Sequence, residues 1–403
     1  MTPAASVDLA GLGFDEGAHV LLRRALVPLR PGARLAVDGR HPQLRVHLPA
    51  WCRANGHRVE WSGPTPVIVR GDRDDQRWLG AVRAGSPGPG SVDPRPASGW
   101  GLAARGSLVE EGGPEVHFDL EERDLVWAAV APRLYAHAAN RQWSPDTAVD
   151  WHAPVDLPDD IEAAVVQVMT YLVENEQAAL LVPARFLGRI HPHFREVVQL
   201  LAVQVADEAR HMEVFTRRAL LRSPTLGSSS AGGRASLWTL VQESDFSLTS
   251  FLLSVLGEGT FVDLLAFLVA HAPDPVTRRV AWLAMQDERR HVLFGVAHLA
   301  EQSRVDPGLR DRLRDRLRDR LRAAVERRHD ALLDTAGLND DVSDALLVLA
   351  AGGWDPASIA SGHRRVQALR QAMDDGRRRR LERLGFPADE AAELSALHTR
   401  NFM

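Results

Sequence analysis

The chain has 403 residues, of which 45% are hydrophobic, so it is long enough to bury a sizeable core and to form two domains. Its 48 basic and 53 acidic residues give a net charge of −5, which offers no positive excess for phosphates and excludes nucleic acid as the main partner. Apolar runs such as 264–272 are shorter than the ~20 residues that cross a bilayer, and the N-terminus has no signal-peptide pattern. We therefore expect a cytoplasmic protein with no membrane partner.

The counts of cysteine and lysine narrow the chemistry. Cys52 is the single cysteine, which excludes a disulfide framework and a metal site built from several thiolates. A metal ion would therefore need carboxylate and imidazole ligands. The basic residues are all arginine, so the chain can form neither a Schiff-base lysine nor a P-loop.

The first part of the chain predicts a small α/β domain over residues 1–72, because short β-like runs alternate with helical patterns. A linker is predicted over 73–118, where Pro and Gly are frequent and disfavour both helix and strand pairing. We expect the following elements in the first domain: strands at 7–9 and 34–37, helices at 17–29 and 41–55, and a closing strand pair at 58–61 and 67–70.

The remainder, residues 119–403, is predicted to be nearly all helical, because apolar residues recur there at helical spacing. Residues 310–322 repeat the unit Arg-Asp-Arg-Leu, which indicates a solvated helix with one packed edge of leucines. A second basic cluster at 377–380 is too short to indicate nucleic-acid binding.

Two segments of the helical part share a motif. Residues 207–211 read Asp-Glu-Ala-Arg-His, and residues 287–291 read Asp-Glu-Arg-Arg-His. Each contains Glu-x-x-His, and residues three apart on a helix share a face, so each segment can direct a carboxylate and an imidazole at one ion. Glu176 and Glu258 lie at similar distances upstream of the two motifs, which indicates a duplicated two-helix unit.

Glu176 is preferred over Glu174 as the first of these glutamates. Residues two apart on a helix point about 200° apart, so only one of the two faces inward. Met169 and Leu172 share the face of Glu176, whereas Gln167 shares the face of Glu174.

One such motif alone reads most simply as an exposed polar pair. Two motifs together with two inward glutamates do not fit that interpretation, because they would bury four carboxylates. Four buried carboxylates repel one another unless cations compensate their charge. The pattern therefore predicts a site for two metal ions.

The pattern resembles the ferritin-like di-iron carboxylate superfamily over about residues 155–300. The resemblance implies a mainly α fold, with a ferritin-like four-helix bundle, extra C-terminal helices and a small α/β domain in front. It implies two iron ions, with Fe/Mn or Mn as alternatives, and O₂ as cosubstrate. The implied ligands are Glu176, Glu208 and His211, mainly for one metal, and Glu258, Glu288 and His291, mainly for the other, with glutamates bridging.

The resemblance also assigns residues around the ligands. Asp207 and Asp287 sit where family members place carboxylates behind the ligands, and pseudo-symmetry predicts that Asp287 accepts from His211 and Asp207 from His291. The neighbouring arginines of both motifs are predicted to be salt-bridge partners. Arylamine N-oxygenases of the superfamily carry an extra histidine ligand where this chain has Ala284, which disfavours that subgroup.

The N-terminal domain resembles the TusA/SirA-like sulfur-carrier fold, because residues 48–57 read Leu-Pro-Ala-Trp-Cys-Arg-Ala-Asn-Gly-His. The active Cys-Pro motif of that family is absent, since residues 13–17 read Gly-Phe-Asp-Glu-Gly. We expect Cys52 to be a buried packing residue and the domain to serve docking, dimerisation or capping of a pocket.

These features predict an O₂-dependent non-heme di-iron oxidase or oxygenase, a homodimer acting on a small organic molecule. Electrons would come from an external reductase or ferredoxin, and Gln204 and Ser254 would be the polar groups of an apolar pocket. Two alternatives stay open: a ferritin-like protein for iron storage or peroxide detoxification, and a sulfur-trafficking adaptor with a structural bundle.

Overall fold

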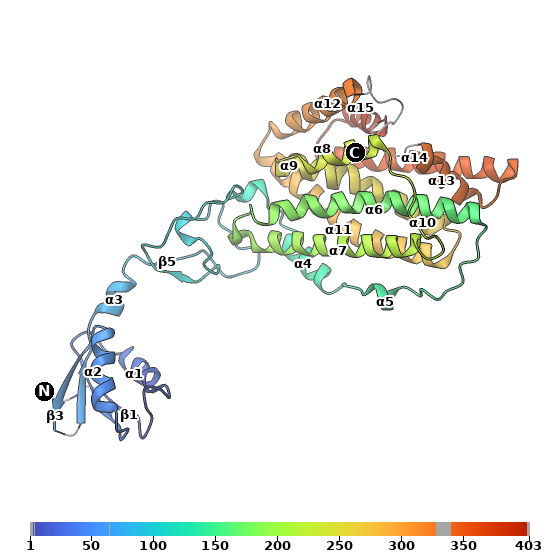
Figure 1. Ribbon diagram of the computed structural model, residues 1–403. Coiled ribbons are helices and arrows are strands. Elements are labelled where there is room, and N and C mark those ends of the chain that lie inside the picture. Colours follow the sequence, from blue (N-terminus) through green and yellow to red (C-terminus); the bar gives the residue numbers. More distant parts are fainter. Residues whose placement is uncertain (1–2, 4, 64, 328–339, 401–403) are drawn as a thin grey trace. The chain divides into compact units, whose positions relative to one another are not determined.

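The computed structural model describes residues 3, 5–63, 65–327 and 340–400 (Figure 1). The chain divides into two compact units: Met1–Ala84 with Ala103–Glu115, and Gly85–Leu102 with Val116–Met403. The segment 73–118, which the sequence predicts to be a linker, contributes to both units and contains short elements. These are α3 (Arg73–Arg77), β5 (Val82–Arg83), η1 (Ser98–Trp100) and β6 (Leu108–Val109).

The N-terminal unit contains the predicted α/β elements, although both helices are shorter than expected. Its sheet has the order β1-β2-β4-β3, in which β1 and β2 run parallel and β4 pairs antiparallel with both β2 and β3. Leu22, Leu48 and Cys52 of the two helices pack on Leu35 and Ile68 of the sheet, and all five are fully buried. The elements are β1 (Ala5–Asp8), α1 (Ala18–Leu26), β2 (Arg34–Asp38), α2 (Leu44–Ala54), β3 (Arg58–Ser62) and β4 (Thr65–Val69).

The second unit is helical, which confirms the predicted mainly α fold class. Its elements are η2 (Arg123–Leu125), α4 (Ala131–Ala139), α5 (Pro145–Ala148), α6 (Asp159–Leu187), η3 (Pro192–Phe194), α7 (Arg195–Ala219), α8 (Ala231–Val241), α9 (Phe246–Ser250), η4 (Phe251–Glu258), α10 (Gly259–His271), α11 (Pro275–Val305), α12 (Leu309–Arg327), α13 (Asp340–Ala351), α14 (Pro356–Arg383) and α15 (Ala388–Arg400).

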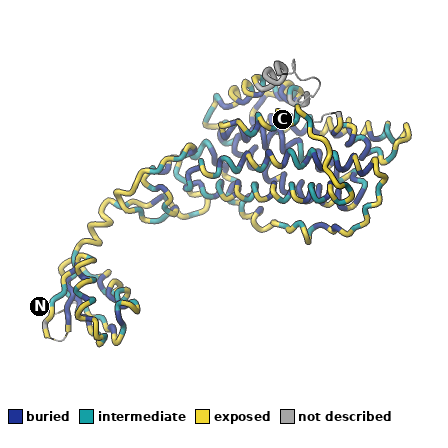
Figure 2. The backbone as a smooth tube through the Cα atoms, viewed as in Figure 1, coloured by how far each residue is buried: buried dark blue, intermediate teal, exposed yellow. Residues whose placement is uncertain are grey.

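Four of these segments form the bundle. Helix α6 packs along α7, α10 packs along α11, and α11 also contacts α7, so the pairs close into a four-helix arrangement (Figure 1). Helix α11 begins where the sequence supplies a cap: Asp274 Oδ1 accepts from the Thr277 amide at 2.8 Å, and Pro275 holds the first helical position. Buried backbone concentrates inside this bundle, with exposed residues on its outer helices (Figure 2).

The third bundle segment contains an element that the sequence did not predict. Residues Phe251–Glu258 form η4, a π-helix, between the α-helices α9 and α10. All of its residues are buried. A π-helical turn is wider than an α-helical one and is frequent at functional sites. Here the π-helix ends at Glu258, one of the predicted ligands.

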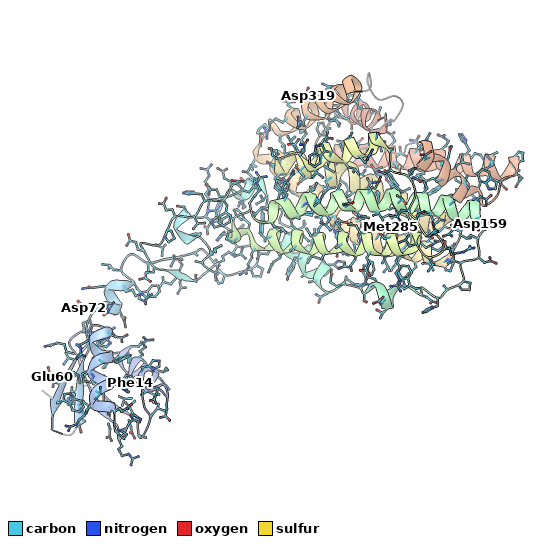
Figure 3. All side chains as sticks on the ribbon, viewed as in Figure 1. Phe14, Glu60, Asp72, Asp159, Met285 and Asp319 are labelled. Carbon is cyan, nitrogen blue, oxygen red and sulfur yellow. The ribbon has the colours of Figure 1, made fainter. Side chains whose placement is uncertain are left out.

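Two apolar clusters fill the bundle. On α7 the first cluster ends at Leu201 and the second begins at Val214. On α11 the second cluster ends at Met285, labelled in Figure 3, and the first resumes at Phe294. The predicted ligand positions of both helices fall in the interval between the clusters. The bundle therefore has a polar layer enclosed by apolar packing on either side.

The C-terminal helices cover the bundle. Helix α13 packs on α6, α14 packs on α13 and α10, and α12 contacts α15. The Arg-Asp-Arg-Leu repeat lies on α12, and Leu313 and Leu317 are buried there, as the predicted packed edge requires.

The segment Phe246–His271 has an 18-residue window with mean hydropathy 1.9, so by length and composition it could cross a membrane. Its uninterrupted apolar runs are shorter, because polar residues such as Ser254 and Glu258 lie within it. In the structure 78% of that window is buried inside the bundle, which is the environment of a core helix.

Candidate metal centre

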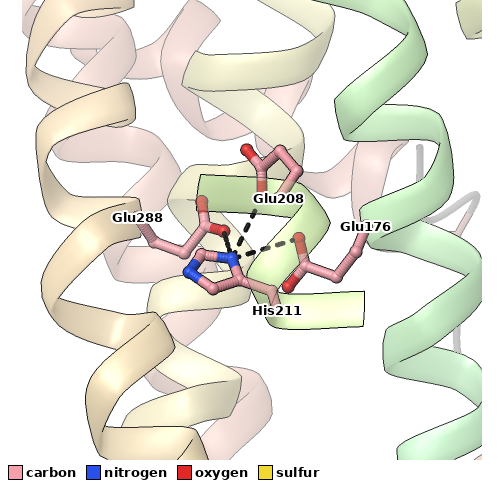
Figure 4. Close-up of side chains that lie close together, drawn as sticks. All are labelled: Glu176, Glu208, His211 and Glu288. Atoms are coloured by element: carbon pink, nitrogen blue, oxygen red, sulfur yellow. Dashed lines mark hydrogen bonds and ion pairs between the residues drawn. The ribbon is translucent and has the colours of Figure 1, made fainter. Parts of the chain in front are cut away.

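The polar layer contains all six predicted ligands. Their ligand atoms form two groups, each within 4.8 Å, and Glu208 and Glu288 belong to both groups. Figure 4 shows Glu176, Glu208, His211 and Glu288 converging, and these side chains come from α6, α7 and α11. All six are buried. They are Glu176 on α6, Glu208 and His211 on α7, Glu258 at the end of η4, and Glu288 and His291 on α11.

The two histidines face the centre through Nδ1. His211 Nδ1 lies 3.1 Å from Glu208 Oε2, 3.3 Å from Glu288 Oε1 and 3.5 Å from Glu176 Oε2. His291 Nδ1 lies 3.1 Å from Glu208 Oε1, 3.4 Å from Glu288 Oε2 and 3.9 Å from Glu258 Oε1. Glu208 and Glu288 therefore each turn one oxygen toward each histidine, whereas Glu176 faces His211 and Glu258 faces His291.

The helical face decides between the two neighbouring glutamates of α6. The structure places Glu176 inside, with 1% of its surface exposed, whereas Glu174 is half-buried. Glu176 belongs to one of the two ligand groups and Glu174 to neither.

Each histidine has a carboxylate behind it. His211 Nε2 lies 3.2 Å from Asp287 Oδ2, and His291 Nε2 lies 3.2 Å from Asp207 Oδ2, which is the crosswise pairing that the sequence predicts. An Nε2–H group that donates to an aspartate leaves the Nδ1 lone pair free to point inward. Each aspartate thus fixes the tautomer in which the opposite imidazole can bind a metal.

The aspartates are held by further charges. Arg290 forms ion pairs with Asp207, at 3.2 Å, and with Asp287, and Arg210 forms an ion pair with Asp207. Burial favours protonation of Asp287, but His211 and Arg290 outweigh it and hold the pKa of Asp287 below its usual value. Both arginines are therefore the salt-bridge partners that the sequence predicts.

Two residues of this layer had no sequence signal. Trp143 Nε1 donates to Asp287 Oδ2 at 2.7 Å, and its ring is stacked with His211 at 6.4 Å between centroids. Gln142 Nε2 donates to Asp207 Oδ1 at 3.2 Å. Both lie in the irregular segment between α4 and α5, where no periodic pattern marks an inward face.

Gln204 and Ser254, the expected polar groups of a pocket, both contact Glu258. Gln204 Nε2 donates to Glu258 Oε1 at 2.8 Å, and Ser254 hydrogen-bonds the same carboxyl group. Gly295 of α11 permits this approach, because a Cβ there would lie 2.3 Å from Ser254 Cβ. Both side chains therefore hold Glu258 in place. Ala284, at the position of the extra histidine of arylamine N-oxygenases, is fully buried in the second apolar cluster.

The charges in this layer do not balance. Burial, and then the carboxylate of Glu208, raise the pKa of Glu176 well above its usual value. Burial, and then the carboxylate of Glu288, raise the pKa of Glu258 well above its usual value. Burial lowers the pKa of His211, but Glu176 and Asp287 outweigh it and raise that pKa well above normal.

Several atoms in this layer have no hydrogen-bond partner among the described residues. They include Glu176 Oε1, Glu258 Oε2, both carboxylate oxygens of Glu288, and His291 Nδ1, which lies 3.1 Å from Glu208 Oε1 without hydrogen-bond geometry. Buried polar atoms without partners are costly, and two cations would satisfy this set together. Carboxylate and imidazole donors without thiolate fit iron and manganese. The residues present therefore fit a dimetal group.

No protein-family model and no curated protein matches this chain. Solved structures that resemble it include R2-like ligand-binding oxidases. A mutant with an aerobically reconstituted Mn/Fe cofactor gives a TM-score of 0.42 at 16% identity, covering 66% of this chain and 92% of its own. A form of the oxidase with an aerobically reconstituted metal cofactor, after photoconversion, gives a TM-score of 0.40 at 15% identity. That match covers 66% of this chain and 89% of the oxidase chain. At such low values the likeness carries no argument about ligand or reaction.

Proposed function

We propose that this protein is an O₂-dependent oxidoreductase with two metal ions, and that it oxidises a small organic molecule. One observation carries the proposal: four glutamates and two histidines converge in a buried layer, and several of their ligand atoms have no partner among the described residues. Iron is the proposed metal, with manganese in one or both positions as the alternative.

The chain's own residues have distinct tasks in this proposal. Glu176 and His211 would hold one ion, Glu258 and His291 the other, and the oxygens of Glu208 and Glu288 would be shared. Bound iron or manganese would supply redox chemistry, in which reduction of dioxygen accompanies oxidation of the substrate. Asp207 and Asp287 orient the imidazoles, and the two apolar clusters exclude bulk water from the layer.

The partners of this chemistry are part of the proposal. We propose an external reductase or ferredoxin as electron donor, because Gly11-x-Gly13 is too short for a dinucleotide-binding loop. A homodimer in the cytoplasm is the assembly that we propose.

Dioxygen uptake by the chemically reduced protein tests the function. Uptake in proportion to bound metal is expected for the wild type and for Glu174→Gln, whose side chain lies outside the ligand groups. Glu288→Ala should abolish both metal binding and uptake, because both ligand groups contain Glu288. Uptake by metal-loaded wild type no faster than by Glu288→Ala would contradict the oxidase function.

The storage alternative makes different predictions about size and capacity. A storage protein is expected to form a large shell and to take up iron far beyond two ions per chain, whereas an enzyme is expected to stay a small oligomer that saturates at two. Light scattering and iron titration of the same sample separate the two functions.

The sulfur-adaptor alternative depends on the N-terminal unit. Cys52 is fully buried, and burial raises the pKa of its thiol to about 12. Sulfur transfer needs an accessible thiolate. We expect a thiol reagent to label Cys52 only after unfolding, and fast labelling of the native protein would revive the adaptor function.

A further inference from the structure

A pocket of about 200 Å³ is lined by residues of α10, α11 and α14. Four of its lining residues are arginines: Arg289 on α11, and Arg379, Arg380 and Arg383 on α14. Asp263 on α10 is the acidic residue of the lining. We call this feature the arginine pocket. It lies outside the polar layer that holds the six ligands.

The arginine pocket carries an excess of positive charge, because four arginines line it with one carboxylate, Asp263, which offsets only part of the charge of Arg379 and Arg380. Within the described ranges, no carboxylate lies at ion-pair distance from any of its four guanidinium groups. Arg378, the neighbour of Arg379 on the same helix, does not line the pocket and has a partner, since its Nη2 lies 2.7 Å from Asp374 Oδ2. Arg378 thus has the carboxylate partner that the four lining arginines lack among the described residues.

Arg380 is the most enclosed of the four. Its Nε donates to the Val255 carbonyl of η4 at 2.6 Å, and its Nη2 is buried without a hydrogen-bond partner among the described residues. Burial and the neighbouring arginines lower the pKa of Arg380 to about 10 against the opposing effect of Asp263, so the group stays protonated at neutral pH. A buried cationic nitrogen without a partner is costly, and an anion would remove this cost.

Two helical glycines make room for this guanidinium. A Cβ on Gly259 would lie 2.3 Å from Arg380 Nε, and a Cβ on Gly376 would lie 2.8 Å from Asp263 Oδ2 and 3.0 Å from Arg380 Nη1. Glycine inside a helix is unfavourable relative to alanine. Its presence at both positions is explained by packing, because a side chain at either one would crowd Arg380. Two facing helices thus make space for the guanidinium of Arg380.

We propose that the arginine pocket binds a phosphate group, either as inorganic phosphate or as the phosphate of a small monoester. Guanidinium groups match phosphate oxygens in planar, bidentate geometry, and several of them suit a dianion better than a single carboxylate. The site is linked to the metal centre through the chain, because Gly259 follows Glu258 and Arg289 follows Glu288. A bound anion would therefore brace the helices that carry these ligands. The proposal does not depend on the oxidase function.

Calorimetric titration of the full-length protein at constant ionic strength tests the site. Inorganic phosphate is expected to bind saturably at one site per chain, and phenyl phosphate likewise. Whichever of the two binds more tightly identifies the source of the group. Acetate is expected to bind at least about tenfold more weakly, because it offers one charge to several guanidinium groups. Acetate binding as tightly as phosphate would overturn the assignment.

Arginine variants locate the binding. Arg379→Gln and Arg383→Gln alter exposed side chains, so the fold should persist, and each is expected to weaken phosphate binding about tenfold. Gly376→Ala keeps every charge but crowds Arg380, and a similar loss is expected. Arg378→Gln is the matched control and should bind as the wild type does. Saturable binding absent from the wild type, or equal weakening in Arg378→Gln and Arg383→Gln, would overturn the proposal.

Discussion

Two buried charged clusters occupy the same bundle, and they differ in whether the chain completes them. The first is the metal centre, where carboxylate oxygens lack partners. The second, which we call the Arg218 cluster, consists of Arg218 on α7, Glu162 on α6, and Asp274 and Thr277 at the start of α11. Arg218 donates to Glu162 at 2.7 and 2.9 Å, to Asp274 at 2.9 Å and to Thr277 at 2.7 Å.

The difference separates a structural ion cluster from a ligand site. In the Arg218 cluster every guanidinium nitrogen donates to a named acceptor, and Asp274 also caps α11. Burial lowers the pKa of Arg218, but Glu162 and Asp274 outweigh it and raise that pKa. The metal centre has carboxylates of the same kind at similar depth, yet the described chain supplies them too few cations. Burial of charge therefore indicates function only where partners are missing.

The largest expected effect comes from breaking the complete cluster. Arg218→Ala leaves Glu162 and Asp274 buried without their cation, and the free energy of unfolding should fall by about 3–5 kcal/mol. Denaturant titration measures this loss. Arg217→Ala, whose partner Asp146 is exposed and whose guanidinium lies over Trp151, is the control and should cost about 1 kcal/mol. Equal losses in the two variants would contradict the structural role of the Arg218 cluster.

His298 is a buried titratable group that lacks an ion-pair partner within the described ranges, so it extends the comparison between complete and incomplete buried clusters. Among the described residues His298 has one hydrogen bond, at 3.2 Å to the Trp127 carbonyl, and burial lowers its pKa from 6.5 to about 4. The unfolded chain binds this proton at higher pH than the folded protein, so the contribution of His298 to stability is complete above pH 6.5 and lost toward pH 4. The loss should be about 3 kcal/mol.

The variant His298→Phe removes this titration while it keeps the ring. The unfolding free energy of the wild type minus that of the variant should fall by about 3 kcal/mol as pH falls from 6.5 to 4. Chemical unfolding across that interval measures it. A difference that stays constant with pH would show that His298 binds its proton as readily in the folded protein as in the unfolded chain, so that burial does not lower its pKa.

The smallest expected effect is a change in the stability of the metal-free protein. Whether the variant is more or less stable than the wild type is what tests the account. Glu176→Gln removes one of four converging carboxylates, so it should stabilise the metal-free protein by about 1–2 kcal/mol while it weakens metal binding. Glu174→Gln, on the half-buried neighbour, should change either quantity little. Thermal unfolding after chelation, and again after reloading with iron, measures both. A metal-free Glu176→Gln less stable than wild type would mean that the carboxylates are paired within the chain.

The sequence predicted which six side chains converge in the buried layer, because their positions follow patterns with a physical meaning. Three-residue spacing puts Glu208 and His211 on one helical face, and the same spacing recurs in α11. Apolar neighbours at helical steps distinguished Glu176 from Glu174. The crosswise aspartates followed from the pseudo-symmetry of the two motifs.

Other parts of the molecule had no such signal. The run Phe251–Glu258 is almost wholly apolar, so no periodicity distinguishes a π-helix from an α-helix there. Arg377 stands in a run of arginines that reads as a surface, yet it is fully buried and donates to Ser395 at 3.0 Å. Trp143 reaches Asp287 from an irregular segment. Tertiary contacts between distant segments decide all three features, and local patterns do not encode them.

The central claim is that the acid-rich layer holds two metal ions. Crystals of the full-length protein, grown from iron-supplemented cells and measured at the iron and manganese absorption edges, test it most directly. We predict two anomalous peaks, one contacted by His211 and Glu176 and the other by His291 and Glu258, with Glu208 and Glu288 contacting both. A fully occupied crystal with one peak or none in this layer would contradict the account.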